Sequence, residues 1–152
     1  MTYRITGLDP RPFEPLFALS DDELERRGMK RMTVTGHGFP CRISLVDRPA
    51  GDSVILLNHV SHDVANPYRA SHAIFVANAR RAEFVDAVPP VFAPRILSLR
   101  AFDEDGMMQD AAVVQPGESD AAIRTLFDDN RIAYIHAHNA ARGCFSARID
   151  RC

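Results

Sequence analysis

Residues 132–150 read IAYIHAHNAARGCFSARID, in which apolar and polar side chains alternate over two runs. Such alternation is typical of β-strands that have one face in the core. The break between the runs contains Gly143, which readily takes the positive φ of a tight turn. The stretch predicts an antiparallel hairpin of Ile132–His138 and Cys144–Asp150, closed over Asn139–Gly143. The side chains expected on its core face are Ala133, Ile135, Ala137, Phe145, Ala147 and Ile149.

The register of this hairpin determines which polar side chains meet. The simplest register that keeps one face wholly apolar forms three polar pairs. These pairs are His138 with Cys144, His136 with Ser146, and Tyr134 with Arg148. Facing side chains have Cβ atoms about 4.5–5.5 Å apart, so the polar groups would share one patch. A β-bulge near Gly143 would shift the pairing and separate His138 from Cys144.

Two reactive chemistries fit this polar face. His136 and His138 form a His-x-His pair whose rings point the same way, as a metal chelate requires, and Cys144 would add a thiolate. His138 and Cys144 would alternatively form an activated nucleophile in which the imidazole takes the thiol proton. These two residues are therefore the catalytic candidates, and the two histidines are the metal candidates. The sequence requires no cofactor, and a divalent metal stays an open alternative.

Ligand binding without reaction is the functional interpretation that we prefer from the sequence. Tyr134, Asn139 and Arg148 would contact a small polar or anionic molecule, together with the two histidines and the thiol. Arg42 and Arg100 lie inside β-like runs, where a charge is costly unless it is paired or faces water. With Arg148 they would make a positive concavity suited to a carboxylate or phosphate. The alternative is a solvated hairpin face without function.

Three other histidines lie at the ends of predicted strands. His59 and His62 are three residues apart at the end of one run, and His72 begins another. An approach of His62 or His72 to the hairpin would create a three-histidine site. Because strand-end histidines are usually capped or solvated, we do not expect this approach.

Two helices are predicted outside the hairpin. Ser20 and Glu23 have the spacing of a capping box, so a helix is expected to start there, run to Arg27 and end at Gly28. A second helix is expected over Glu118–Asp128, which has one apolar face and acidic residues near its start.

Runs rich in Val, Ile, Leu and Thr predict the remaining strands. These runs are Tyr3–Gly7, Arg31–Thr35, Cys41–Asp47, Ser53–Val60, Ala73–Ala77, Ile96–Phe102 and Met108–Gln115. Asp103–Gly106 is a hairpin signal between the last two. Ala82–Pro94 carries three prolines and is expected to be a loop with at most a short helix. The predicted class is α+β, a mostly antiparallel sheet with about two helices, in one compact domain of residues 1–152.

Composition and charge exclude several classes of protein. The 152 residues are 46% apolar and 25% charged, as in an ordinary folded domain. The net charge of −2 argues against nucleic-acid binding, and no apolar run approaches the roughly 18 residues of a membrane span. Residues 1–5 lack the apolar region of a signal peptide, so we expect a cytoplasmic protein with free thiols. A protein-interaction module, using a β edge or the proline-rich loop, remains a further alternative, and the oligomeric state is not predicted.

Four motifs carry a resemblance to a known family. They are Pro40-Cys41-Arg42, Pro67-Tyr68-Arg69-Ala70-Ser71, Leu97-Ser98-Leu99-Arg100-Ala101-Phe102-Asp103, and His136-Ala137-His138-Asn139 with Gly143-Cys144. On these motifs the chain resembles the bacterial family of domain of unknown function 1203 over essentially its whole length. The resemblance implies a small single-domain protein and adds no mechanism. The family tends to have Ser-Gly-Pro where this chain has Ser71-His72-Ala73, so the resemblance implies no shared ligand role for His72.

Overall fold

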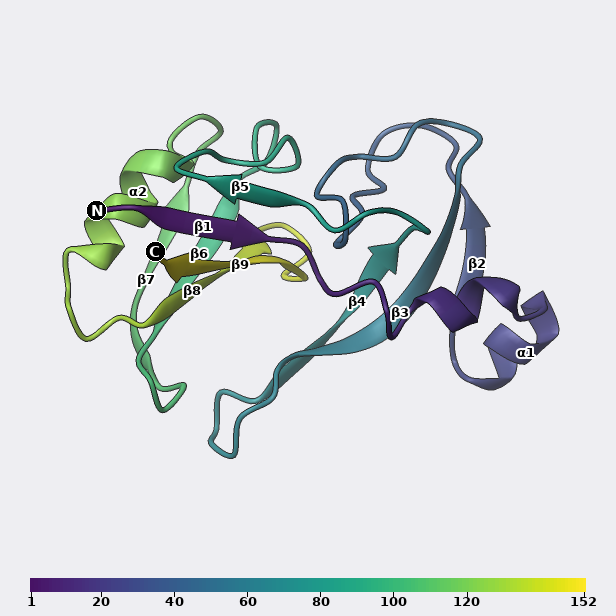
Figure 1. The fold of residues 1–152 in the computed structure, drawn as a ribbon, viewed down its shortest axis with the longest axis horizontal. Coiled ribbons are helices and arrows are strands. Elements are labelled where there is room, and N and C mark those ends of the chain that lie inside the picture. The colour runs from purple at the N-terminus through teal and green to yellow at the C-terminus, as the bar shows by residue number, and fades with distance from the viewer.

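Two antiparallel sheets make up most of the fold in the computed structural model, which describes residues 1–152 (Figure 1). The larger sheet has the order β5-β1-β9-β8-β6-β7, with the bounds β1 (Tyr3–Thr6), β5 (Glu83–Val85), β6 (Leu97–Phe102), β7 (Met108–Val114), β8 (Tyr134–Asn139) and β9 (Phe145–Arg151). The smaller sheet has the order β2-β3-β4, with the bounds β2 (Lys30–Thr33), β3 (Ser53–His62) and β4 (Ala70–Val76). The predicted α+β class with antiparallel strands is confirmed.

Both predicted helices are present. The helix α1 (Asp21–Arg26) begins with the capping box, because Ser20 and Glu23 exchange side chain-to-backbone hydrogen bonds. Gly28 follows with a φ of 75°, which allows the chain to turn away. The helix α2 (Ser119–Phe127) packs against the larger sheet, and a 3₁₀ turn spans Glu14–Ala18. In Figure 1, α2 and α1 lie at opposite ends of the molecule.

Each sheet has its own apolar core. Ile135 and Ala137 of β8 pair with Ile149 and Ala147 of β9, and all four are buried in the cluster that contains α2. The smaller sheet packs against α1 and the 3₁₀ turn in a second cluster. Because side chains alternate along β8, its other face points away from the α2 core and meets the smaller sheet. The polar face of the predicted hairpin is therefore an internal face.

The register of the hairpin differs from the prediction. Tyr134 is opposite Asp150 and His136 is opposite Arg148, and a β-bulge then places His138 opposite Phe145. All three predicted polar pairs, His138 with Cys144, His136 with Ser146 and Tyr134 with Arg148, are therefore wrong. Phe145 is buried as expected, but against the rings of His136 and His138 rather than in the α2 core. The prediction assumed a single apolar environment. The smaller sheet supplies a second apolar environment, so the bulge can turn Phe145 away from the α2 core without exposing it to water.

Two other segments also depart from the predictions. Cys41–Asp47 is not a strand: the amide of Leu45 donates to the carbonyl of Cys41, and Leu45 has a φ of 54°. Its alternating apolar residues are buried, but by a compact turn rather than by a sheet. Ala82–Pro94 contains β5, and Val91 and Phe92 belong to the larger core. No helix of the structure has the length and apolarity needed to cross a membrane.

Candidate functional site

Four histidines meet between the two sheets. His62 of β3 lies with its ring centre 5.1 Å from that of His136, and His72 of β4 lies 4.9 Å from His138. The approach that the sequence did not favour therefore takes place. This approach follows from the antiparallel pairing of β3 with β4, which places the end of β3, with His62, beside the start of β4, with His72.

A cavity of about 210 Å³ opens beside this cluster, and we call it the histidine pocket. Among its ten lining residues are five with basic side chains, namely His62, Arg69, Arg100, His136 and His138. No acidic residue lines it. The salt bridge of Arg69 with Asp63 lies on exposed side chains. Arg100 has no salt-bridge partner, and its Nε lies 3.5 Å from Ser98 Oγ, the limit of a hydrogen bond. Arg100 is thus a lining cation without an acidic partner, whereas Arg69 is paired with Asp63 outside the cavity lining.

His136 is one of the buried residues of the pocket wall. The sheet places it between Arg100 of β6 and Arg148 of β9, and the residue is 2% exposed. Its Nδ1 is buried without a hydrogen-bond partner. Burial, followed by the neighbouring His62 and Arg148, lowers the pKa of His136 to about 2, so the ring is neutral at pH 7.

The tautomers of the two neighbouring histidines follow from their hydrogen bonds. Nδ1 of His62 lies 2.9 Å from the carbonyl oxygen of Tyr68, and Nδ1 of His138 lies 2.9 Å from that of Gly143. A carbonyl oxygen only accepts, so each Nδ1 carries the proton and each Nε2 bears a lone pair. Nε2 of His62 accepts from the Tyr134 hydroxyl at 2.6 Å. Burial lowers the pKa of His138 to about 4, so this ring is also neutral.

Tyr134 and Arg148 form one edge of the site. The guanidinium of Arg148 stacks 3.9 Å from the centre of the Tyr134 ring and bonds Asp150 at 2.8 Å. Burial raises the pKa of the Tyr134 hydroxyl, which therefore keeps its proton for the hydrogen bond to His62. This pair links β8, β9 and β3.

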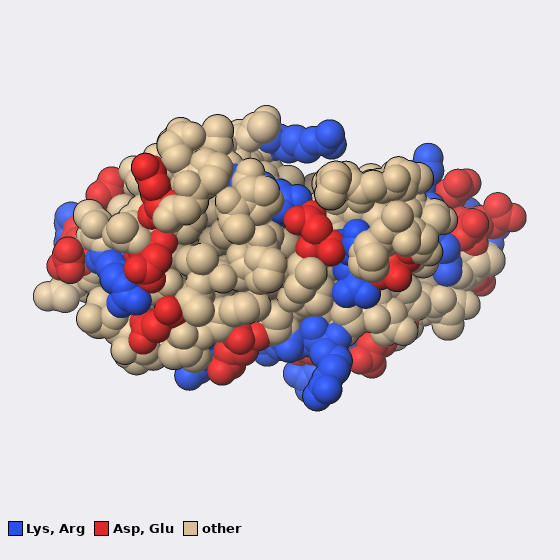
Figure 2. Space-filling view, turned by 90° about the horizontal axis from the view of Figure 1, so that it is seen from above, with Lys and Arg blue, Asp and Glu red and all other residues tan.

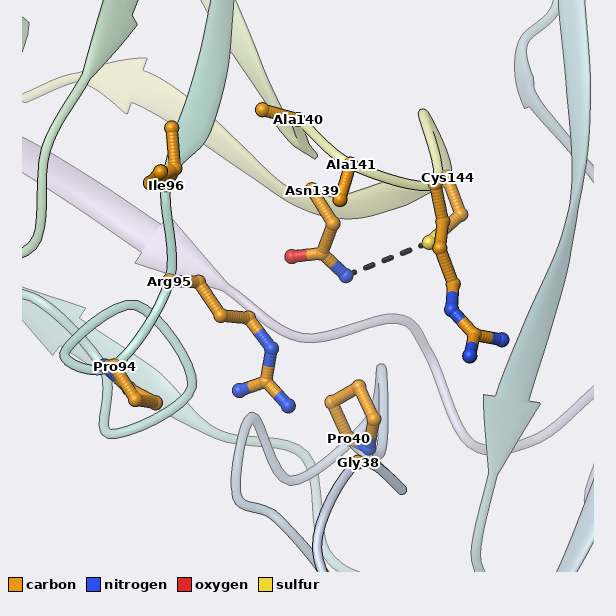
Figure 3. A pocket seen from close by; sticks show the side chains of 10 residues that line it. Gly38, Pro40, Pro94, Arg95, Ile96, Asn139, Ala140, Ala141 and Cys144 are labelled. Carbon is orange, nitrogen blue, oxygen red and sulfur yellow. Dashed lines mark hydrogen bonds between the residues drawn. The ribbon is translucent and has the colours of Figure 1, made fainter.

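Two of the remaining candidates from the sequence, Asn139 and Cys144, line a second, larger cavity of about 630 Å³, which we call the cysteine pocket (Figure 3). Sγ of Cys144 lies 3.2 Å from Nη2 of Arg42 and 3.4 Å from Nδ2 of Asn139. Arg42 is 2% exposed and donates its other bonds to the carbonyls of Phe145 and Pro40. It has no acidic partner. Burial lowers the pKa of its guanidinium.

The structure thus divides the predicted site residues between two cavities. Five gather around the histidine pocket: Tyr134, His136, His138, Arg100 and Arg148. Three gather around the cysteine pocket: Cys144, Asn139 and Arg42. The bulge separates the groups, because His138 faces Phe145 whereas Asn139 and Cys144 follow on the other side of the hairpin. His138 and Cys144 therefore do not form the pair that an activated nucleophile would need.

Sequence reasoning placed too little weight on the smaller sheet. His62, Tyr68 and Arg69 line the histidine pocket, and His72 packs on His138. The available signal was the spacing of His62 and His72 at two strand ends joined by a short turn. No group of three or more His, Cys, Asp or Glu has a geometry that could hold a metal ion.

The fold and the two cavities define an α+β protein of two antiparallel sheets with a basic, histidine-lined pocket between them. A family model described as protein of unknown function (DUF1203) matches residues 38–151. The chain belongs to this family, and the matched range includes every residue that lines either cavity. No curated protein and no solved structure matches the chain significantly.

Proposed function

We propose that this protein binds a small anion in the histidine pocket. The observation that carries the proposal is the buried Nδ1 of His136, which has no partner within the chain and belongs to a side chain that lines the cavity. A buried polar atom without a partner costs roughly 1–3 kcal/mol, so such atoms are rare without a reason. A ligand that reaches the ring would remove this cost.

The charge of the pocket favours an anion over a neutral or cationic ligand. With His136 and His138 neutral, the charges at the wall are those of Arg69 and Arg100, and no carboxylate faces them inside the cavity. Arg100 is only partly exposed to water, and this burial lowers the pKa of its guanidinium. Hydrogen bonds from such a group to an anion are stronger than in water.

The size of the pocket limits the ligand to a few heavy atoms. Sites for drug-sized molecules usually measure about 300–1,000 Å³, whereas this cavity measures about 210 Å³. An inorganic oxyanion or a short carboxylate fits this volume. A polyanion is not favoured, because acidic and basic side chains are interspersed on the face seen in Figure 2 and form no continuous basic stripe there.

Thermal unfolding at pH 7 in the presence of phosphate, sulfate, acetate and lactate tests this proposal. We expect at least one anion to raise the melting temperature of the wild type, and Arg100→Gln to weaken its binding about tenfold or more. Arg80→Gln is the matched control, since Arg80 is exposed and away from both cavities. The proposal fails if no anion shifts the wild type. It also fails if Arg142→Gln, in the cysteine pocket, abolishes the shift instead.

A thiol-based activity at Cys144 is the second candidate function. It is favoured by the buried Arg42, whose guanidinium reaches Sγ while no carboxylate balances its charge. Because this guanidinium lies 3.2 Å from Sγ, we expect Cys144 to react faster with iodoacetamide than the exposed Cys152 at pH 7. Site-resolved mass spectrometry measures both rates in one sample. Equal or slower labelling of Cys144 would remove this candidate.

A further inference from the structure

We infer that the anion of the histidine pocket keeps an acidic hydroxyl of its own, as hydrogen phosphate and phosphomonoester monoanions do and sulfate does not. This inference rests on the proposed function and adds the chemical class of the ligand. It follows from which pocket atoms donate hydrogen bonds and which accept them.

The first part of the argument is the acceptor at His138. Its Nδ1–H is committed to the carbonyl of Gly143, so its Nε2 bears the lone pair and makes no hydrogen bond within the chain. Protonating Nε2 at neutral pH is unfavourable, because the residue is 2% exposed and the nearby Arg100 repels a positive charge on the ring. The pocket therefore presents a hydrogen-bond acceptor here, and an acceptor requires a ligand hydroxyl.

The second part concerns His62 and Tyr134, neither of which offers a hydrogen-bond donor to the pocket. The tyrosine hydroxyl gives its proton to Nε2 of His62, whose Nδ1–H is already used by the carbonyl of Tyr68. The hydroxyl oxygen of Tyr134 keeps only lone pairs for any further bond. Both groups are thus fixed in a chain of hydrogen bonds that offers no free proton to the pocket.

The third part is the donor side. Arg100 lines the same cavity, and its guanidinium offers only N–H groups. His136 lies on the strand next to it and has one orphaned nitrogen, which a neutral ring can use as a donor or an acceptor according to its tautomer. A ligand that satisfies both sides carries an anionic oxygen toward Arg100 and a hydroxyl toward His138. A fully deprotonated oxyanion has no proton to donate, so an oxygen lone pair would face the lone pair on Nε2 of His138.

Calorimetry at pH 7 on the full chain tests the inference with four tetrahedral anions. They form two pairs of similar size, phosphate with sulfate and arsenate with selenate. Phosphate and arsenate carry a hydroxyl at this pH, whereas sulfate and selenate do not. We expect sulfate and selenate to bind about tenfold or more weakly than phosphate and arsenate, the effect of one unsatisfied buried acceptor. Methyl phosphate is the fifth arm, compared with phosphate at about pH 5.5, where the phosphomonoester keeps its hydroxyl because its second pKa is near 6. This arm distinguishes a phosphomonoester from free phosphate as the preferred source of the group.

The His138→Gln variant assigns the selectivity to one atom. Its amide can turn an N–H toward the ligand, so the preference for phosphate over sulfate should fall toward one, while His37→Gln, in an exposed loop, should preserve it. Equal binding of sulfate and phosphate by the wild type overturns the inference and leaves the proposed function standing. Absence of binding by all five anions overturns the inference, and it overturns the proposed function as well when acetate and lactate also fail to bind. If the variant does not fold, the wild-type series alone decides between these outcomes.

Discussion

At the scale of single residues, the unusual feature is that neutral histidines are buried beside arginines. His136 and His138 keep their rings uncharged because burial disfavours the imidazolium and neighbouring cations repel it. Neutral imidazoles provide both a donor and an acceptor, whereas arginines only donate. The combination allows a pocket to select among anions by their protonation and not only by their charge.

The buried histidines should make the protein sensitive to mild acid. Unfolded histidine has a pKa near 6.5, whereas His136 and His138 remain neutral in the fold until about pH 2 and 4. Stability is therefore complete above pH 6.5 and is lost as the pH falls toward these lower values, because only the unfolded chain takes up the protons. Each ring contributes a slope of about 1.4 kcal/mol per pH unit between pH 6 and 4.5.

Urea unfolding of the wild type, His138→Gln and His37→Gln over that pH range measures these slopes. The change of the unfolding free energy with pH should be smaller for His138→Gln than for the wild type, by the equivalent of about one proton. For His37→Gln, whose site is exposed, it should equal that of the wild type. A His138→Gln slope identical to that of the wild type would contradict the prediction. The window avoids Asp9 and Asp129, whose arginine partners hold their pKa values at about 2.

At the scale of elements, the end of β1 is where the chain leaves the larger sheet. Gly7 donates to Ala82 and the next amide donates to Arg42, so backbone from three segments converges there. A Cβ on Gly7 would lie 1.9 Å from the carbonyl oxygen of Ile43, a backbone atom that cannot rotate away. Glycine is required here by close approach rather than by its φ.

The variant Gly7→Ala should therefore lower the free energy of unfolding by about 2 kcal/mol or more, since overpacking against backbone costs 1–3 kcal/mol and occasionally more. Chemical denaturation measures the change. Gly36→Ala is the matched control, because its added Cβ meets nothing within 4 Å and its φ is not positive. Equal stability of the two variants would show that the β1 exit is looser than the structure indicates.

At the scale of the whole molecule, the two sheets are connected at the histidine pocket. The 2.6 Å hydrogen bond from Tyr134 to His62 joins β8 of one sheet to β3 of the other. An occupied pocket would add contacts from both sheets to one ligand. Anion binding should therefore stabilise the association of the sheets as well as each sheet alone.

Removal of one hydroxyl tests this link between the sheets. Tyr134→Phe leaves Nε2 of His62 without its donor, so we expect a loss of about 1–2 kcal/mol in the free energy of unfolding. Tyr68→Phe is the control, since the Tyr68 side chain is exposed and only its backbone carbonyl serves His62. If the two variants are equally stable, the hydrogen bond contributes nothing to joining the sheets.

Elements whose signals are local can be predicted from the sequence alone. The capping box at Ser20 and Glu23, the amphipathic α2 and the alternation of β8 are read from residues within a few positions of one another. Such patterns depend on backbone geometry and on one side of each element being buried. They were sufficient to predict the α+β class and the hairpin.

Only the tertiary structure decided which polar residues share a cavity. The hairpin register differs from the prediction by two positions at His136, and the bulge turns Phe145 onto the face that the second sheet buries. The same sheet brought His62 and His72 onto His136 and His138 from more than sixty residues away in the chain. Contacts between distant segments depend on how whole surfaces pack, and no local pattern encodes that. The sequence therefore determined the hairpin, and the packing of the two sheets determined the pocket.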